Sequence, residues 1–391
     1  MTQPSKASSR QPARRCNRYL RAARNSIAWM WCDMRDGLKI AIIGHLKYPI
    51  AQPFAGGLEM HTHLLARHLI ARGHDVTLFA AEGSDPALAP VCVCEPTGIP
   101  SDTVSQASIA DTEHRAYAEI IGSIATGGFD VVHNNSLHYL PLIEAHRIAA
   151  PMVTMFHTPP FPELVHGVVE RGRRDIQFFG VSEKVRAMWR KVIAVDGVIM
   201  NGIELDLFTA HLEAPRVPVA LWYGRLVPEK GAHLAIAAAR LAKMPLRLVG
   251  PRNDAVYWRD VIAPELGPDI TYLGHLDHAD LAAEIAQASV AVITPRFEEP
   301  YGLVVAEALA CGTPVAGFAR GALPELLDDA TGRLVPPDDV EALAKALPQA
   351  VVLSRAACRR RAELLCDARV MMDGYEALYR QLLAPYAIAA E

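Results

Sequence analysis

The chain has 391 residues, of which 51% are hydrophobic and 21% are charged, with a formal net charge of −4. This length predicts two domains, and the apolar content is sufficient for packed cores. The charge is unevenly spread: residues 1–36 contain eight Lys or Arg and two Asp, whereas the remainder contains 31 basic and 41 acidic residues. An acidic body with 7% aromatic residues is not expected to bind nucleic acid, which requires cations and base-stacking rings.

The cysteine usage predicts a cytoplasmic location. The chain has seven cysteines and no Cys-x-x-Cys, a pattern that favours free thiols in a reducing compartment. No run of eighteen apolar residues is present, so no membrane-spanning helix is expected. The basic extension 1–36 has three interpretations: a disordered tail, an over-extended start, or an amphipathic segment that touches an anionic membrane surface.

The first block of alternating elements begins at Leu38. Apolar runs predict strands, joined by helices with a periodic apolar stripe, and thus a parallel sheet buried on both faces. Residues 84–110 are expected to be irregular, with a helix over 112–125. The strands are expected at 38–43, 75–79, 130–133, 151–156, 177–182 and 198–202.

Two features of this block are candidates for ligand binding. Gly56 and Gly57 start a helix, where backbone N–H groups can approach a ligand closely, although a simple turn would also use them. His157 ends a strand and is predicted to face the crevice where α/β folds bind ligands. His133 and His138 are weaker candidates, attributed to loop polarity. No Gly-x-Gly-x-x-Gly follows the first strand, which disfavours an NAD-linked oxidoreductase.

A second block follows a linker at 203–217. Arg225 and Lys230 lie on a glycine-flanked loop after its first strand, where two cations can clamp a diphosphate, although such side chains are often only solvated. Gly250 and Pro251 end the next strand and Gly274-His275 ends the one after. We expect these strand ends to line a nucleobase through backbone contacts.

The stretch 290–318 predicts a strand, a loop, a helix and a strand. Unpaired N–H groups at the helix start form a ready phosphate site. Glu307 lies roughly 7–8 Å along the helix from that start, about the step from a diphosphate to its ribose. Glu299 lies just before the helix and could accept hydrogen bonds from hydroxyl groups. Taken alone, helix capping and solvation would also explain both glutamates.

The string Glu299-x-Tyr-Gly-Leu-x-x-x-Glu307-Ala-x-Ala-x-Gly-x-Pro-Val315 resembles the donor-site signature of the retaining family-4 glycosyltransferases. Gly224-Arg-Leu-x-x-x-Lys-Gly231 resembles their second signature, in which Arg and Lys bind the phosphates of the leaving nucleotide. Phe156-His-Thr-Pro159 is similar to the family's histidine near the transferred sugar, and Gly56-Gly57 to its glycine loop between the donor phosphates and the acceptor.

The resemblance implies an α/β GT-B fold with two Rossmann-like domains. It implies catalytic roles for His157, Arg225, Lys230 and Glu299, and a nucleotide-sugar site formed by Gly56, Gly57, Arg225, Lys230, Gly250, Pro251, Tyr301, Gly302, Leu303, Val304 and Glu307. We expect an acceptor-side domain over 37–205, a donor domain over 206–365, and a C-terminal helix within 366–391 that crosses back to the first domain.

The predicted activity is the transfer of a hexose-type sugar, with retention of configuration, from a UDP-, GDP- or ADP-sugar to an acceptor hydroxyl. No His/Cys/Asp cluster has metal-ligand spacing, so neither a metal nor another cofactor is expected. The acceptor, whose contacts are expected in loops 44–54 and 159–174, could be a saccharide, a lipid-linked compound or a small molecule. A nucleotide-sugar epimerase of the same fold and a catalytically silent binding module are the alternatives.

Overall fold

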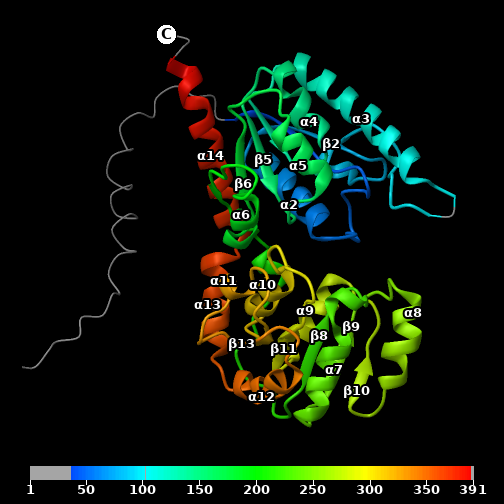
Figure 1. Cartoon of the computed structure of the whole chain (residues 1–391). Helices are drawn as coiled ribbons and strands as arrows, with labels where there is room; N and C mark the ends of the chain where they lie inside the picture. The colour runs from blue at the N-terminus through cyan, green and yellow to red at the C-terminus, as the bar shows by residue number, and fades with distance from the viewer. Residues whose placement is uncertain (1–36, 102, 389–391) are drawn as a thin grey trace, which may run out of the picture. The chain divides into compact units, whose positions relative to one another are not determined.

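The computed structural model describes residues 37–101 and 103–388, so the predictions for the basic extension lie outside the described residues. The first half of this region forms a seven-stranded sheet in the order β3-β2-β1-β4-β5-β6-β7, in which all pairs are parallel. Its elements (Figure 1) are β1 (Lys39–Ile43), α2 (Gly57–Ala71), β2 (Asp75–Ala80), β3 (Val91–Cys92), α3 (Gln106–Thr126), β4 (Val131–Asn134), α4 (Leu140–Ile143), β5 (Met152–Phe156), α5 (Pro162–Val169), β6 (Gln177–Gly180), α6 (Glu183–Trp189) and β7 (Gly197–Val198).

The second half forms a six-stranded parallel sheet in the order β10-β9-β8-β11-β12-β13. Its elements (Figure 1) are β8 (Ala220–Tyr223), α7 (Ala232–Leu241), β9 (Leu246–Val249), α8 (Ala255–Tyr257), β10 (Ile270–Tyr272), α9 (His278–Gln287), β11 (Val290–Ile293), α10 (Leu303–Ala310), β12 (Val315–Phe318), α11 (Leu323–Leu326), β13 (Gly332–Val335), α12 (Val340–Val351), α13 (Arg355–Leu365) and α14 (Ala368–Ile388).

Both sheets reverse their winding direction beside their first strand. The reversal falls between β1 and β4 in the first sheet and between β8 and β11 in the second. Ligands in open α/β sheets bind at such points, outside the carboxyl ends of the strands, because the connections leave there in opposite directions and open a crevice. The predicted α/β architecture of two Rossmann-like sheets is confirmed, and each sheet carries one such crevice.

Three local predictions need correction. The segment predicted as irregular contains β3, and α3 begins six residues early because the Ser105 hydroxyl accepts a hydrogen bond from the Ser108 N–H. The sequence pattern also predicts an apolar stripe of Leu58, Leu65 and Leu69 on α2. Leu58 is only partly buried, and the buried face of that helix includes the polar residues Glu59, His61 and Thr62. That polar buried face proves important for the site.

The last helix, α14, packs against α2 and β4 of the first sheet. Buried Tyr375 and Tyr379 carry this contact, and an ion pair of 2.8 Å joins Arg72 to Asp373 at its edge. Hydrophobic burial of two tyrosine rings stabilises such a contact by several kcal/mol in total (~2 kcal/mol per large side chain). No helix among the described residues is long and apolar enough to cross a membrane.

Candidate active site

A cleft of about 1070 Å³ is lined by residues of both halves of the chain. Its walls contain the predicted catalytic and nucleotide-sugar-binding residues, Gly56, Gly57, His157, Arg225, Lys230, Gly250, Pro251, Glu299, Tyr301, Gly302, Leu303, Val304 and Glu307. Of the expected strand end Gly274-His275, only His275 is part of the wall. The predicted catalytic and binding residues come from the carboxyl ends of β5, β8 and β9, from the start of α2, from the loop between β11 and α10, and from the first two turns of α10. The cleft thus lies at the sheet edge where both crevices open.

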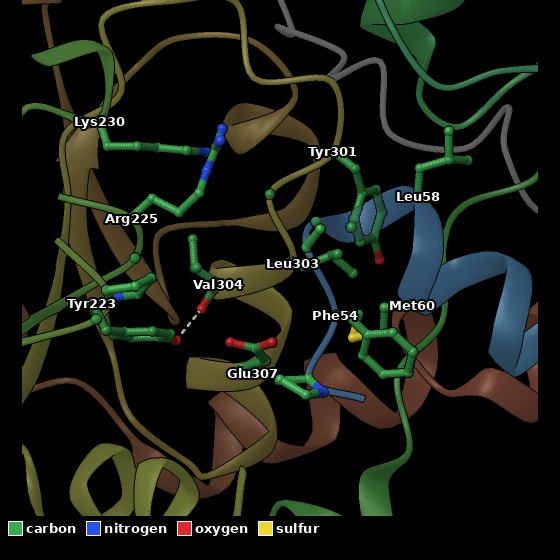
Figure 2. Close-up of a pocket in the computed structure, with 18 of the residues that line it drawn as sticks. Phe54, Leu58, Met60, Tyr223, Arg225, Lys230, Tyr301, Leu303, Val304 and Glu307 are labelled. Carbon is green, nitrogen blue, oxygen red and sulfur yellow. Dashed lines mark hydrogen bonds between the residues drawn. The ribbon is translucent and has the colours of Figure 1, made fainter. Parts of the chain in front are cut away.

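The loop after β8 holds Arg225 and Lys230. Glycines at both ends have positive φ, +145° at Gly224 and +72° at Gly231, which lets the chain turn sharply twice within eight residues. The Thr294 hydroxyl donates to the Gly231 carbonyl at 2.9 Å and ties the loop to the end of β11. Both cationic side chains are therefore presented to the cleft by a fixed backbone (Figure 2).

The two cations differ in their partners. Lys230 donates to the Glu299 carboxylate at 2.8 Å and lies 4.5 Å from the centre of the Phe297 ring. The Arg225 guanidinium is exposed and makes no hydrogen bond or ion pair within residues 37–101 and 103–388. Its charge is one of several that act on Glu59: burial would raise the pKa of that carboxyl, but the His45 hydrogen bond and the charges of His45 and Arg225 lower it overall.

The loop before α10 fixes Glu299 through its backbone. The Glu299 carbonyl accepts a hydrogen bond from the Ala322 N–H at 2.9 Å, and a Cβ at Gly321 would overlap the Glu299 backbone. The two neighbours of Glu299 contact the other half of the chain. Lys184 donates to Glu298 at 2.8 Å, and the Ser182 hydroxyl donates to the Pro300 carbonyl at 2.6 Å.

The first turn of α10 borders the cleft below these loops. Gly302, with a φ of +96°, begins the helix, and Leu303 and Val304 follow in the wall. Leu303 is close enough to α2 that a Cβ at Gly57 would lie 2.8 Å from its Cδ1. The Tyr223 hydroxyl donates to the Val304 carbonyl (Figure 2). Tyr301 also belongs to the wall, although its side chain is almost completely buried.

Glu307 is one turn further along α10 and reaches the same cleft (Figure 2). Burial raises the pKa of its carboxyl from 4.5 to about 8, and no neighbouring cation opposes this effect. Because the pKa lies above neutrality, the carboxyl is mostly protonated at pH 7. Near pH 7 the described wall of the cleft consequently carries the positive charges of Arg225 and Lys230 and the negative charges of Glu299 and Asp277.

The His157 ring belongs to a buried polar cluster that was not predicted from the sequence. Its Nε2 lies 3.0 Å from Asn135 Oδ1, and His133 Nε2 lies 3.1 Å from the same oxygen. The His61 ring lies 4.6 Å from the His157 ring, centre to centre. The attribution of His133 and His138 to loop polarity is wrong: His133 lies within β4 and is fully buried, and His138 is packed between two tyrosine rings.

Other wall residues also escaped the sequence analysis. Leu137 lines the cleft with a φ of +54°, a conformation that costs a β-carbon-bearing residue roughly 1–2 kcal/mol. Thr158 Oγ1 and Asn201 Oδ1 are buried and lack a hydrogen-bond partner among the described residues, and both residues line the cleft. Unpaired buried polar atoms are costly, so a ligand that pairs them would gain affinity. Only the position of Thr158 beside His157 could have indicated this from sequence.

Comparisons with known proteins agree with this geometry. Residues 55–207 match the family described as Glycosyltransferase Family 4, and residues 217–351 match Glycosyl transferases group 1. The chain is similar to D-inositol 3-phosphate glycosyltransferases: it is 28% identical to that of Mycobacterium avium, covering 90% of this chain and 96% of the relative. For that of Mycobacterium tuberculosis the identity is 29%, with 90% and 85% covered.

Two solved structures share the architecture. Sucrose-phosphate synthase from Thermosynechococcus elongatus is 25% identical, with 88% of this chain and 99% of that chain covered and a TM-score of 0.71. Anabaena HepE, solved in complex with UDP and glucose, is 19% identical, with 88% and 100% covered and a TM-score of 0.68. The chain therefore belongs to the GT-B glycosyltransferases, with a family 4 domain in its first half and a group 1 domain in its second.

Proposed function

We propose that this glycosyltransferase moves a hexosyl group from a nucleoside-diphosphate sugar to an acceptor hydroxyl, with retention of anomeric configuration and without a metal ion. The observation that carries the proposal is the charge pattern of the cleft. Arg225 and Lys230 face the first turn of the α10 region from one fixed loop, and the guanidinium has no protein partner among the described residues. A diphosphate supplies the anionic partner that the Arg225 guanidinium lacks.

The proposed donor occupies the second half of the cleft. Its diphosphate lies between Arg225, Lys230 and the N-terminal N–H groups of α10, its ribose hydroxyls bind Glu307, and its base contacts the backbone at Gly250 and Pro251. When the donor binds, Lys230 turns part of its interaction from Glu299 to the phosphate. The Glu299 carboxylate can then accept hydrogen bonds from the sugar hydroxyls. His157 binds the same sugar from the first half of the chain.

The reaction breaks the bond between the anomeric carbon and the leaving phosphate oxygen, which keeps the electron pair. The acceptor hydroxyl attacks from the same face, and its proton passes to that phosphate oxygen. Arg225 and Lys230 stabilise the charge that develops on the departing diphosphate. A single preorganised donor of this kind contributes roughly 3–4 kcal/mol in other enzymes, and two such cations would take the place of a divalent ion.

The walls of the cleft also favour an uncharged, hydroxyl-bearing acceptor. All the Asp, Glu, Lys and Arg side chains of its described wall come from the second half: Arg225, Lys230, Asp277, Glu299 and the mostly protonated Glu307. The first half offers the polar groups of Thr158 and Asn201 beside the apolar Phe54 and Met60. The mycobacterial relatives are named for D-inositol 3-phosphate, so inositol and its phosphate form a matched pair of probes. A higher kcat/KM for the phosphate would contradict an uncharged acceptor.

The experiment that tests the donor class is a thermal-shift screen against UDP, GDP, ADP and NAD, followed by hydrolysis of the corresponding nucleotide sugars. We expect one nucleoside diphosphate to raise the melting temperature and its sugar to be hydrolysed slowly. Stabilisation by NAD alone would refute the proposal. Retention is tested by using methanol as the acceptor: NMR of the methyl glycoside should show the anomeric configuration of the donor, and the inverted glycoside would refute retention.

A further inference from the structure

A buried chain of hydrogen bonds connects the C-terminal helix to His157. The Tyr379 hydroxyl lies 2.7 Å from His133 Nδ1, and Asn135 Oδ1 lies between His133 Nε2 at 3.1 Å and His157 Nε2 at 3.0 Å. The Asn135 amide nitrogen donates to Thr62 Oγ1 at 3.3 Å. The exposed fraction is 0% for Tyr379, His133 and Asn135 and 8% for His157, so water does not compete for these bonds.

The three clustered histidines His61, His133 and His157 are neutral near pH 7. Burial lowers the pKa of His133 to about 3 and that of His61 to about 4, and burial together with the neighbouring His61, His133 and His45 holds the pKa of His157 well below its usual range. A neutral imidazole has one N–H donor and one bare nitrogen. Which nitrogen carries the proton is decided by the partner of the other nitrogen.

In both His133 and His157, the partner of Nε2 is a hydrogen-bond acceptor. Asn135 Oδ1 has no hydrogen to donate, so both rings that contact it must carry their proton on Nε2. His133 Nδ1 is then bare and accepts from the Tyr379 hydroxyl, and His157 Nδ1 is bare as well. Because Nε2 of His157 is already used, Nδ1 is the ring nitrogen left for a ligand in the cleft that His157 lines.

We propose that Asn135 is a positioning residue that fixes the Nε2–H tautomer of His157, so that the bare Nδ1 accepts a hydrogen bond from a hydroxyl of the transferred sugar. The Tyr379 hydroxyl donates to His133 Nδ1 and so favours the Nε2–H tautomer of His133, which donates to Asn135. Through these two hydrogen bonds α14 helps to hold Asn135 in place. Only the assignment of this hydroxyl to the transferred sugar rests on the proposed function. The backbone of Asn135 is also held in place, because its main-chain N–H donates to the Ile43 carbonyl at 2.9 Å. This bond lies at the winding reversal of the first sheet, between β1 and β4.

The chain offers a matched control for Asn135. Asn134 is the preceding residue, is equally buried, and donates to Thr154 Oγ1 at 3.2 Å without touching a histidine. Asn135→Ala should lower kcat for sugar transfer about 10- to 100-fold, the range expected when a buried polar group loses its partner. Asn134→Ala should leave kcat within about threefold. Equal losses in the two variants would indicate a merely structural role and overturn the proposal.

An Asn135→Asp variant separates tautomer control from packing. The new carboxylate raises the pKa of His157, so that the ring is protonated on both nitrogens near neutrality and Nδ1 can no longer accept. The activity relative to wild type should then rise as the pH rises, because His157 loses the extra proton. A ratio that stays flat between pH 6 and pH 9 would contradict the role of Nδ1.

The decisive measurement is made on the wild-type protein. NMR of the full-length protein labelled with ¹⁵N-histidine distinguishes protonated from bare ring nitrogens, and the His157 signal is assigned from its loss in His157→Gln. We expect Nε2–H and a bare Nδ1 for His157, and a Nδ1–H tautomer would overturn the inference. Failure of the proposed function looks different: no nucleoside diphosphate would bind by calorimetry, while the tautomer would still be as inferred.

Discussion

The Glu307 carboxyl should make the protein less stable as the pH rises, and replacement by glutamine should remove that effect. Its pKa is raised from 4.5 to about 8 by burial. Between these values the folded protein holds a proton that the unfolded chain has released, so the free energy of unfolding falls by about 1.4 kcal/mol per pH unit. This destabilisation is absent below the pKa of the carboxyl in the unfolded chain and is complete above its pKa in the folded protein.

The difference between Glu307→Gln and wild type isolates this group, because all other titrations are common to both proteins. From pH 5 to pH 7.5 the variant should gain about 3 kcal/mol in stability relative to wild type. Urea unfolding followed by tryptophan fluorescence at a series of pH values measures the difference. Glu213→Gln, at an exposed loop position, is the control and should show no such trend. A Glu307→Gln difference that does not change with pH would refute the reasoning.

The remaining predictions concern the loops of the cleft. Arg225→Ala should lower kcat by roughly 10²–10³-fold with an unchanged circular dichroism spectrum, and wild-type kcat would contradict its place beside the leaving phosphate. Leu137→Gly should be more stable than Leu137→Ala by about 1 kcal/mol in urea unfolding, because only alanine keeps the strain of a positive φ; the reverse order would show that the strain is absent. Gly321→Ala and Gly128→Ala substitute positions with φ of +62° and +64°, but only the former would overlap the Glu299 backbone. We therefore expect a loss of kcat for Gly321→Ala alone, measured in the transfer assay, and equal kcat values would argue against a fixed Glu299.

The positions of the cleft residues from the second half could be predicted from sequence because local backbone geometry places them. The glycines around Arg225 and Lys230, and the strand–loop–helix pattern before Glu307, define a loop and a helix start within a few residues. The buried polar cluster could not be predicted in this way. Asn135 and Tyr379 are 244 positions apart in the chain, and only the packing of α14 on α2 and β4 brings them together.

The charge state of Glu307 and the orientation of Lys230 were also beyond the sequence. Its raised carboxyl pKa results from burial without a neighbouring cation to oppose it, which is a property of packing. The ion pair between Lys230 and Glu299 joins residues that the sequence analysis assigned to separate tasks, phosphate and sugar binding. Their contact at 2.8 Å brings the two side chains together at one position in the cleft.

The hydrogen bonds on either side of Glu299 have a consequence for how the two halves can be recombined. Glu298 and Pro300 are bonded to Lys184 and Ser182 of the first half, and the Glu325 carboxylate accepts from the N–H of Lys184 at 2.7 Å. A hybrid enzyme that keeps this second half but takes its first half from a relative would change the partners of the loop that carries Glu299. We therefore expect the exchangeable unit to be the second half together with the segment from Ser182 to the end of α6, so that a working hybrid would be joined before Ser182 and not between the two sheets.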